Sequence, residues 1–68
     1  MAASYKRLWK LLIDKDLKKK DLEALACISH YTVGKLNKDK NVTTDVLGKI
    51  CKALNCNIED IMEFVEDE

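Results

Sequence analysis

The feature that most constrains this chain is the short gap between two stretches of helical apolar spacing within residues 18–37. The first stretch begins at Lys18 or Lys19, and three apolar residues share its inner face: Leu22, Leu25 and Ala26. The second follows Ser29, whose hydroxyl can accept from backbone N–H groups two and three residues on, and runs from His30 to about Leu36. Because only residues 27–29 separate the two helices, they must cross steeply. The sequence therefore predicts a helix-turn-helix arrangement.

Three other segments carry the apolar spacing of amphipathic helices. Along the first segment, five residues fall on one stripe: Tyr5, Leu8, Trp9, Leu12 and Ile13. Thr43 is the predicted N-cap of a helix with a second apolar face: Val46, Leu47, Ile50, Cys51 and Leu54. Asn57, with Asp60 three residues on, is predicted to begin a fifth helix whose apolar residues close the core: Ile58, Ile61, Met62 and Val65.

The composition agrees with a helical protein, because proline is absent and glycine occurs only twice. At 68 residues, the chain has room for one small domain. We therefore expect an all-α fold of five short helices in a single domain over residues 1–68.

The formal net charge of zero hides an uneven distribution along the chain. Residues 59–68 contain six acidic residues and no basic one, so residues 1–58 hold all twelve bases against six acids. The body of the domain is thus basic and suited to a polyanionic partner. We interpret the acidic tail as a solvated end, although it could also orient the domain by repulsion from phosphates.

Several classes of protein are disfavoured. The longest apolar run, residues 24–28, has five residues, whereas a membrane-spanning helix needs about 20. The first residues do not have the pattern of a secretory signal, and three cysteines are an odd number, so we expect free thiols in the cytoplasm. No carboxylate pair, glycine-rich phosphate loop or nucleophile–base pair is apparent, so we predict neither an enzyme nor a cofactor.

Four residues could in number hold a zinc ion: Cys27, His30, Cys51 and Cys56. However, Cys51 falls on an apolar helix face and Cys27 lies in the turn between two helices. Such cysteines behave as small apolar residues, so we predict no metal site.

The helix-turn-helix segment resembles the Cro/CI-type (XRE-like) repressor family. Seven residues carry the resemblance: Leu22, Ala26, Ile28, Ser29, Thr32, Val33 and Leu36. Residues 46–56 are similar to the family's fourth helix, so that the likeness extends over residues 5–65. It implies a lambda-repressor-like domain that binds double-stranded DNA, with the helix 30–36 in the major groove. The expected function is that of a transcriptional regulator, in particular a repressor.

The resemblance also implies which residues touch DNA. It assigns base contacts to four exposed positions of the second helix: His30, Tyr31, Gly34 and Lys35. Lys35 and His30 are expected to donate to guanine O6 and N7, and Gly34 to permit close approach. It assigns phosphate contacts to five residues: Lys19, Ser29, Thr32, Lys38 and Lys40. Because phosphate contacts release counterions, binding should weaken steeply with salt.

The sequence departs from the family pattern at three places. Cys27 stands where the family usually has a turn glycine, and Asp39 replaces a second frequent glycine. A residue other than glycine at positive φ costs of order 1 kcal/mol, so this turn could be strained or rebuilt. Asn37 and Leu12 together replace both members of a Glu–Arg ion pair, which leaves no orphan charge.

The expected partner is a palindromic operator, bound by a homodimer that is weak or forms only on DNA. Such a dimer would use the fourth and fifth helices, and no small-molecule ligand is predicted. The alternative function is a protein-binding module on the same fold, antitoxin-like or adaptor, with an apolar patch at Met62, Phe64 and Val65.

Overall fold

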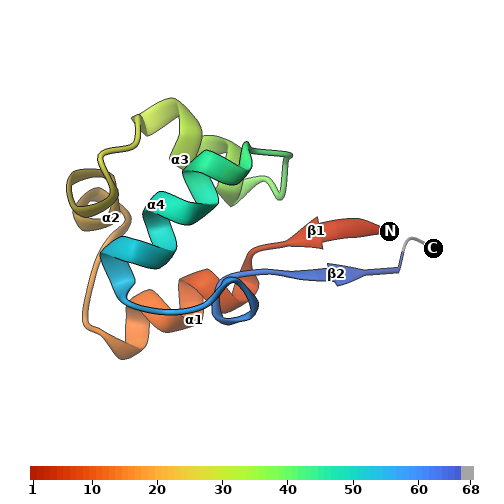
Figure 1. Cartoon of the computed structure of the whole chain (residues 1–68), viewed down its shortest axis with the longest axis horizontal. Coiled ribbons are helices and arrows are strands. Elements are labelled where there is room, and N and C mark those ends of the chain that lie inside the picture. The colour runs from red at the N-terminus through yellow and green to blue at the C-terminus, as the bar shows by residue number, and fades with distance from the viewer. Residues whose placement is uncertain (67–68) are drawn as a thin grey trace.

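The structure is a computed structural model that describes residues 1–66. Its elements in chain order are β1 (Ala2–Ser4), α1 (Lys6–Asp14), α2 (Lys19–Ala26), α3 (His30–Asn37), α4 (Thr44–Leu54), the 3₁₀ turn η1 (Ile58–Asp60) and β2 (Glu63–Val65). The four α-helices form the body of the domain, and β1 and β2 extend from it as a narrow ribbon that carries both ends of the chain (Figure 1). The predicted helical class and the first four predicted helices are confirmed.

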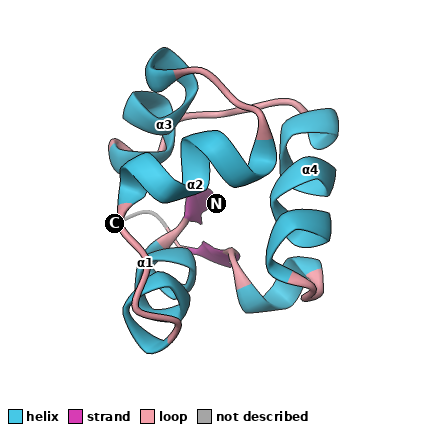
Figure 2. Cartoon of the chain, turned by 90° about the vertical axis from the view of Figure 1, so that its left-hand side faces the viewer, coloured by secondary structure: helices cyan, strands magenta, loops and turns pink. Residues whose placement is uncertain are grey.

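The helices enclose one apolar core, because each of them turns a face of buried side chains inward. α2 packs on both α4 and α3, while α1 and α4 contact η1 (Figure 2). Twelve apolar residues are buried: Tyr5, Leu8, Leu12, Leu22, Ala26, Ile28, Val33, Leu36, Leu47, Ile50, Leu54 and Ile61. All of them except Ile28 belong to the predicted apolar faces or are inward-facing residues of α3.

Two predicted core residues of α1 and α2 lie outside the core. Ile13 is 75% exposed and Leu25 is 52% exposed. Leu12 takes the inner position of α1, and Leu22 and Ala26 take those of α2. Ile13 and Leu25 therefore fall at the edge of each apolar face, where the other helices do not cover them. The predictions for Ile13 and Leu25 were therefore wrong.

The predicted fifth helix is also wrong. Its N-cap is present, since the Asn57 N–H donates to Asp60 Oδ2 at 3.0 Å, but the helix ends after the three residues of η1. Residues 63–65 instead form β2, which pairs antiparallel with β1 and sets Phe64 opposite Ala3. Ile61 is fully buried as predicted, whereas Ile58 is 44% exposed and Val65 is 40% exposed, so the prediction that these two residues close the core was wrong.

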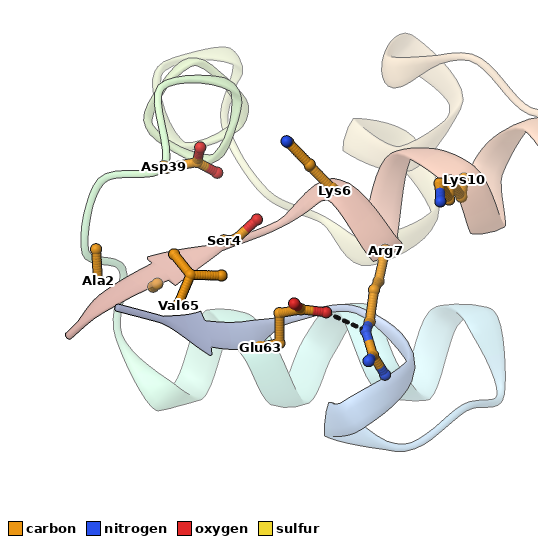
Figure 3. A pocket seen from close by; sticks show the side chains of 9 residues that line it. Ala2, Ser4, Lys6, Arg7, Lys10, Asp39, Glu63 and Val65 are labelled. Atoms are coloured by element: carbon orange, nitrogen blue, oxygen red, sulfur yellow. Dashed lines mark hydrogen bonds and ion pairs between the residues drawn. The ribbon is translucent and has the colours of Figure 1, made fainter. Parts of the chain in front are cut away.

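The terminal ribbon is tied to α1 by Arg7. Its Nε donates to the Glu63 carboxylate (Figure 3). Its Nη1 donates to the Glu59 carbonyl oxygen at 3.0 Å. These contacts hold β2 and η1 beside the first helix, so the acids Glu59 and Glu63 of the predicted tail belong to the folded domain. Asp67 and Glu68 lie outside the described residues.

The turn between α2 and α3 keeps its left-handed backbone without a glycine. Cys27 adopts φ 55° and ψ 45°, and its N–H donates to the Glu23 carbonyl oxygen. Asp39 adopts φ 55° in the loop after α3, and its Oδ1 accepts from the Tyr5 N–H at 3.0 Å. Both positions where a glycine was expected are thus left-handed, at the cost of two non-glycine residues at positive φ.

Candidate nucleic-acid interface

The start of α3 is fixed by its cap. Ser29 Oγ accepts from the Thr32 N–H at 3.1 Å and lies 2.9 Å from Thr32 Oγ1, so one of the two hydroxyls donates to the other. Val33 and Leu36 are buried on the inner side of the helix. Because an α-helix turns about 100° per residue, residues 30, 31, 34 and 35 then lie on the outer side.

This outer side carries the predicted base-reading residues. The His30 side chain is 93% exposed, Tyr31 is 74% exposed, and Gly34 and Lys35 are partly exposed. A shallow hollow of the surface is lined by six residues: His30, Tyr31, Gly34, Lys35, Lys38 and Lys40. The structure therefore brings all four predicted base-reading residues together with two of the five predicted phosphate contacts.

The hollow is positively charged. No carboxylate lines it among the described residues, and the Lys35 Nζ lies 5.3 Å from the centroid of the Tyr31 ring. Asp39 stands between Lys38 and Lys40 in the sequence, but its carboxylate is engaged by the Tyr5 N–H. The loop thus presents its two lysines to the hollow while its acidic residue is bonded to α1.

Gly34 leaves open space at the centre of this surface. A Cβ built at Gly34 would meet no atom of the protein within 4 Å, and no glycine among the described residues has a positive φ. Neither packing nor backbone conformation requires a glycine there. The open space therefore remains available to a molecule outside the chain.

Lys19 connects the beginning of α2 to the end of α3. Its Nζ donates to Asn37 Oδ1 at 2.6 Å and lies 4.6 Å from the centroid of the Trp9 ring. The sequence indicated only that Asn37 and Leu12 replace the two members of a Glu–Arg ion pair. In the structure Asn37 has Lys19 instead, which holds this ammonium group at the end of α3.

Sequence reasoning missed Glu23. Its carboxylate Oε2 lies 3.0 Å from His30 Nδ1, so that the first residue of α3 is bonded back to α2. The contact spans the turn and joins residues seven positions apart, and only the crossing of the two helices brings them together. No local sequence signal points to it, because the two residues belong to different helices.

Two other hollows have a different character. One lies beside the terminal ribbon and mixes Lys6, Arg7 and Lys10 with acidic residues (Figure 3). The other is an apolar groove between α4 and β2, and its walls include Val42, Gly48, Cys51, Ile58, Met62 and Phe64. None of the described residues that line this second groove is charged.

All three cysteines are free thiols, of which Cys27 is exposed and Cys51 and Cys56 are partly buried. Within residues 1–66, no group of three or more histidine, cysteine or acidic residues is placed to hold a metal ion. Burial raises the pKa of the Cys56 thiol, and the nearby Cys51 and Asp60 raise it further. A raised thiol pKa lowers the share of the reactive thiolate. No helix in the described part of the chain is long and apolar enough to cross a membrane.

Comparisons with known proteins agree with this geometry. A family model described as the Cro/C1-type HTH DNA-binding domain matches residues 7–67. The chain is similar to a crystal structure of the transcriptional regulator VanUg (Form II), with 45% sequence identity and a TM-score of 0.93. That alignment covers 97% of this chain and 88% of the other. No curated protein matches the chain.

Proposed function

The chain belongs to the Cro/C1-type helix-turn-helix DNA-binding family, and we propose that it is a repressor that binds a specific double-stranded DNA sequence with α3 in the major groove. The observation that carries this proposal is the exposed hollow on α3 and its following loop, which no carboxylate of the described residues lines and where His30, Tyr31 and Lys35 surround the open space at Gly34. The major groove admits an α-helix and displays distinct donors and acceptors for each base pair.

Each residue of this face has a role that suits its chemistry. Lys35 donates to guanine O6 and N7, while Tyr31 bonds a base or phosphate or packs on a thymine methyl group. Gly34 lets the helix approach the bases closely. Five residues hold phosphates: Lys19, Ser29, Thr32, Lys38 and Lys40. Because Ser29 and Thr32 share one hydroxyl–hydroxyl bond, one O–H of the pair remains free to donate to a phosphate oxygen.

A second copy of the chain would complete the regulator on a palindromic operator. The uncharged groove beside α4 suits this contact, since the partly or largely exposed side chains of Ile58, Met62 and Phe64 would be covered by it. Burial of apolar surface stabilises such an interface by about 25 cal/mol per Å². The proposed dimer contact therefore uses α4, as the sequence predicted, and β2 in place of the predicted fifth helix.

Selection of bound duplexes from a random pool, repeated at two salt concentrations, tests the proposal. We expect one preferred sequence with two-fold symmetry and an affinity that falls steeply with salt. Lys35→Ala should relax the preference at one base position, whereas Lys19→Ala should weaken all sequences alike and reduce the salt slope by about one unit.

Lys52→Ala is the matched control for these variants. It also removes one exposed positive charge, but from the last turn of α4 and outside the hollow. We expect it to leave the preferred sequence unchanged. A preferred sequence that survives Lys35→Ala would contradict the assigned base contact. A chain that selects no sequence, and whose protein partners bind regardless of Lys19 and Lys35, would instead be the protein-binding module.

A further inference from the structure

The contact between Glu23 and His30 determines where the imidazole ring carries its proton. Glu23 Oε2 lies 3.0 Å from His30 Nδ1, and the Glu23 side chain is only 24% exposed whereas that of His30 is 93% exposed. An ionised carboxylate can only accept hydrogen bonds, so Nδ1 must be the donor in this pair. The first residue of α3 is therefore oriented by a charged group of α2.

A neutral imidazole has one N–H and one acceptor nitrogen. When the ring is neutral and its proton is held at Nδ1, Nε2 carries no proton and can only accept. Nε2 lies on the side of the ring away from Nδ1, and Glu23 Oε2 occupies the Nδ1 side. The atom that His30 offers to a ligand on the outer face of α3 is thus an acceptor.

From this geometry we propose that Glu23 is a positioning residue that sets base specificity through His30. In the major groove, adenine presents the N6 amino group and cytosine the N4 amino group as donors, while guanine presents only acceptors. His30 Nε2 accepts from one of these amino groups and disfavours guanine at the same position. This inference rests on the proposed binding of DNA by α3, and it replaces the donation to guanine that the sequence suggested for His30.

Nitrogen-15 spectroscopy tests the first half of the proposal without any DNA. His30 is the only histidine of the chain, so its ring signals need no assignment. In a titration carried to its alkaline limit, we expect the spectrum of the neutral ring to show the proton on Nδ1. Glu23→Ala should move the proton toward Nε2, and Glu23→Gln, whose amide oxygen can still accept, should keep part of it on Nδ1. A ring protonated at Nε2 in the unchanged protein overturns the proposal.

Selection from a random duplex pool tests the second half. The position read by His30 is identified as the one whose preference disappears in His30→Ala. We expect adenine or cytosine there, and we expect Glu23→Ala to reduce the preference over guanine by roughly five- to tenfold, as for the loss of one hydrogen bond. The preference at the position read by Lys35 should not change.

Asp45→Ala is the control for charge, because Asp45 is an exposed acid of α4 that pairs with Lys49 Nζ at 3.4 Å. It removes the same charge as Glu23→Ala and should alter no base preference. If Glu23→Ala leaves the base read by His30 unchanged, the positioning role is wrong. If the unchanged protein selects no sequence, the proposed DNA binding is wrong, and the spectrum still decides the position of the proton.

Discussion

Replacing Gly34 with alanine should change the stability of this domain and its affinity for DNA in opposite directions. A Cβ at Gly34 meets no protein atom within 4 Å, and the backbone there is ordinary helix. Alanine is favoured over glycine by about 1 kcal/mol in a helix interior, so we expect Gly34→Ala to raise the free energy of unfolding by roughly 0.5–1 kcal/mol. For a domain of this size, each kcal/mol corresponds to about 4–8 °C in Tm.

The same methyl group should weaken DNA binding. It would fill the open space at the centre of the hollow, where Gly34 is proposed to approach the bases. An extra methyl group in a close-packed contact typically costs about 1–3 kcal/mol, which corresponds to an increase in Kd of about 5- to 150-fold. The variant should therefore be more stable than the unchanged protein and yet bind its preferred sequence less tightly.

Gly48→Ala is the matched control, because a Cβ at Gly48 in α4 also meets open space. Urea unfolding should show the same gain in stability for both variants. Fluorescence anisotropy should be measured on a duplex with a single half-site, so that contacts between two copies at the groove beside Gly48 do not enter the result. An unchanged Kd for Gly34→Ala would refute the close approach, and a loss of stability would refute the open space around Gly34.

Four further substitutions can be tested on the unbound protein by denaturation. Cys27→Gly should raise the free energy of unfolding by up to about 1 kcal/mol, because glycine adopts a positive φ without the steric strain of a side chain. Asp39→Gly should raise it less or lower it, because this change also removes the acceptor of the Tyr5 N–H. Leu22→Ala should cost about 2–5 kcal/mol, since Leu22 is fully buried, and an unmoved melting curve would contradict the packing of α2. Burial and the nearby Asp39 raise the pKa of the Tyr5 phenol. The folded state therefore favours the neutral phenol. The resulting contribution to the free energy of unfolding is complete below the ordinary tyrosine pKa of about 10 and is lost as the pH rises through the raised pKa of Tyr5. Tyr5→Phe should flatten that alkaline decline, and an identical decline in the variant would show that another group is responsible.

The local signals of the sequence were sufficient for four helices and two caps. Ser29 and Thr43 accept from the N–H groups of Thr32 and Val46, as their positions before apolar runs predicted. These signals depend on residues three or four positions apart, which a single sequence displays directly. The segment after Asn57 carried a similar local signal and was misread, because its pairing partner, β1, lies at the other end of the chain.

The contacts across the turn could not be read from the sequence for the same physical reason. Lys19 and Asn37 are 18 residues apart, and Glu23 and His30 are seven apart. The two residues of each pair belong to different helices, so only the crossing of α2 and α3 brings them within hydrogen-bonding distance. The residues predicted to touch DNA came instead from a family resemblance, and the structure places six of them around one hollow.

The central claim, that the outer face of α3 meets the major groove, is tested most directly by a two-dimensional NMR titration of the protein with its selected duplex. We expect the largest shifts of backbone amide signals, and intermolecular contacts to base protons, within residues 29–40 and at the beginning of α2. Shifts confined to the groove beside α4 and β2, with the signals of Tyr31 and Lys35 unmoved, would contradict it.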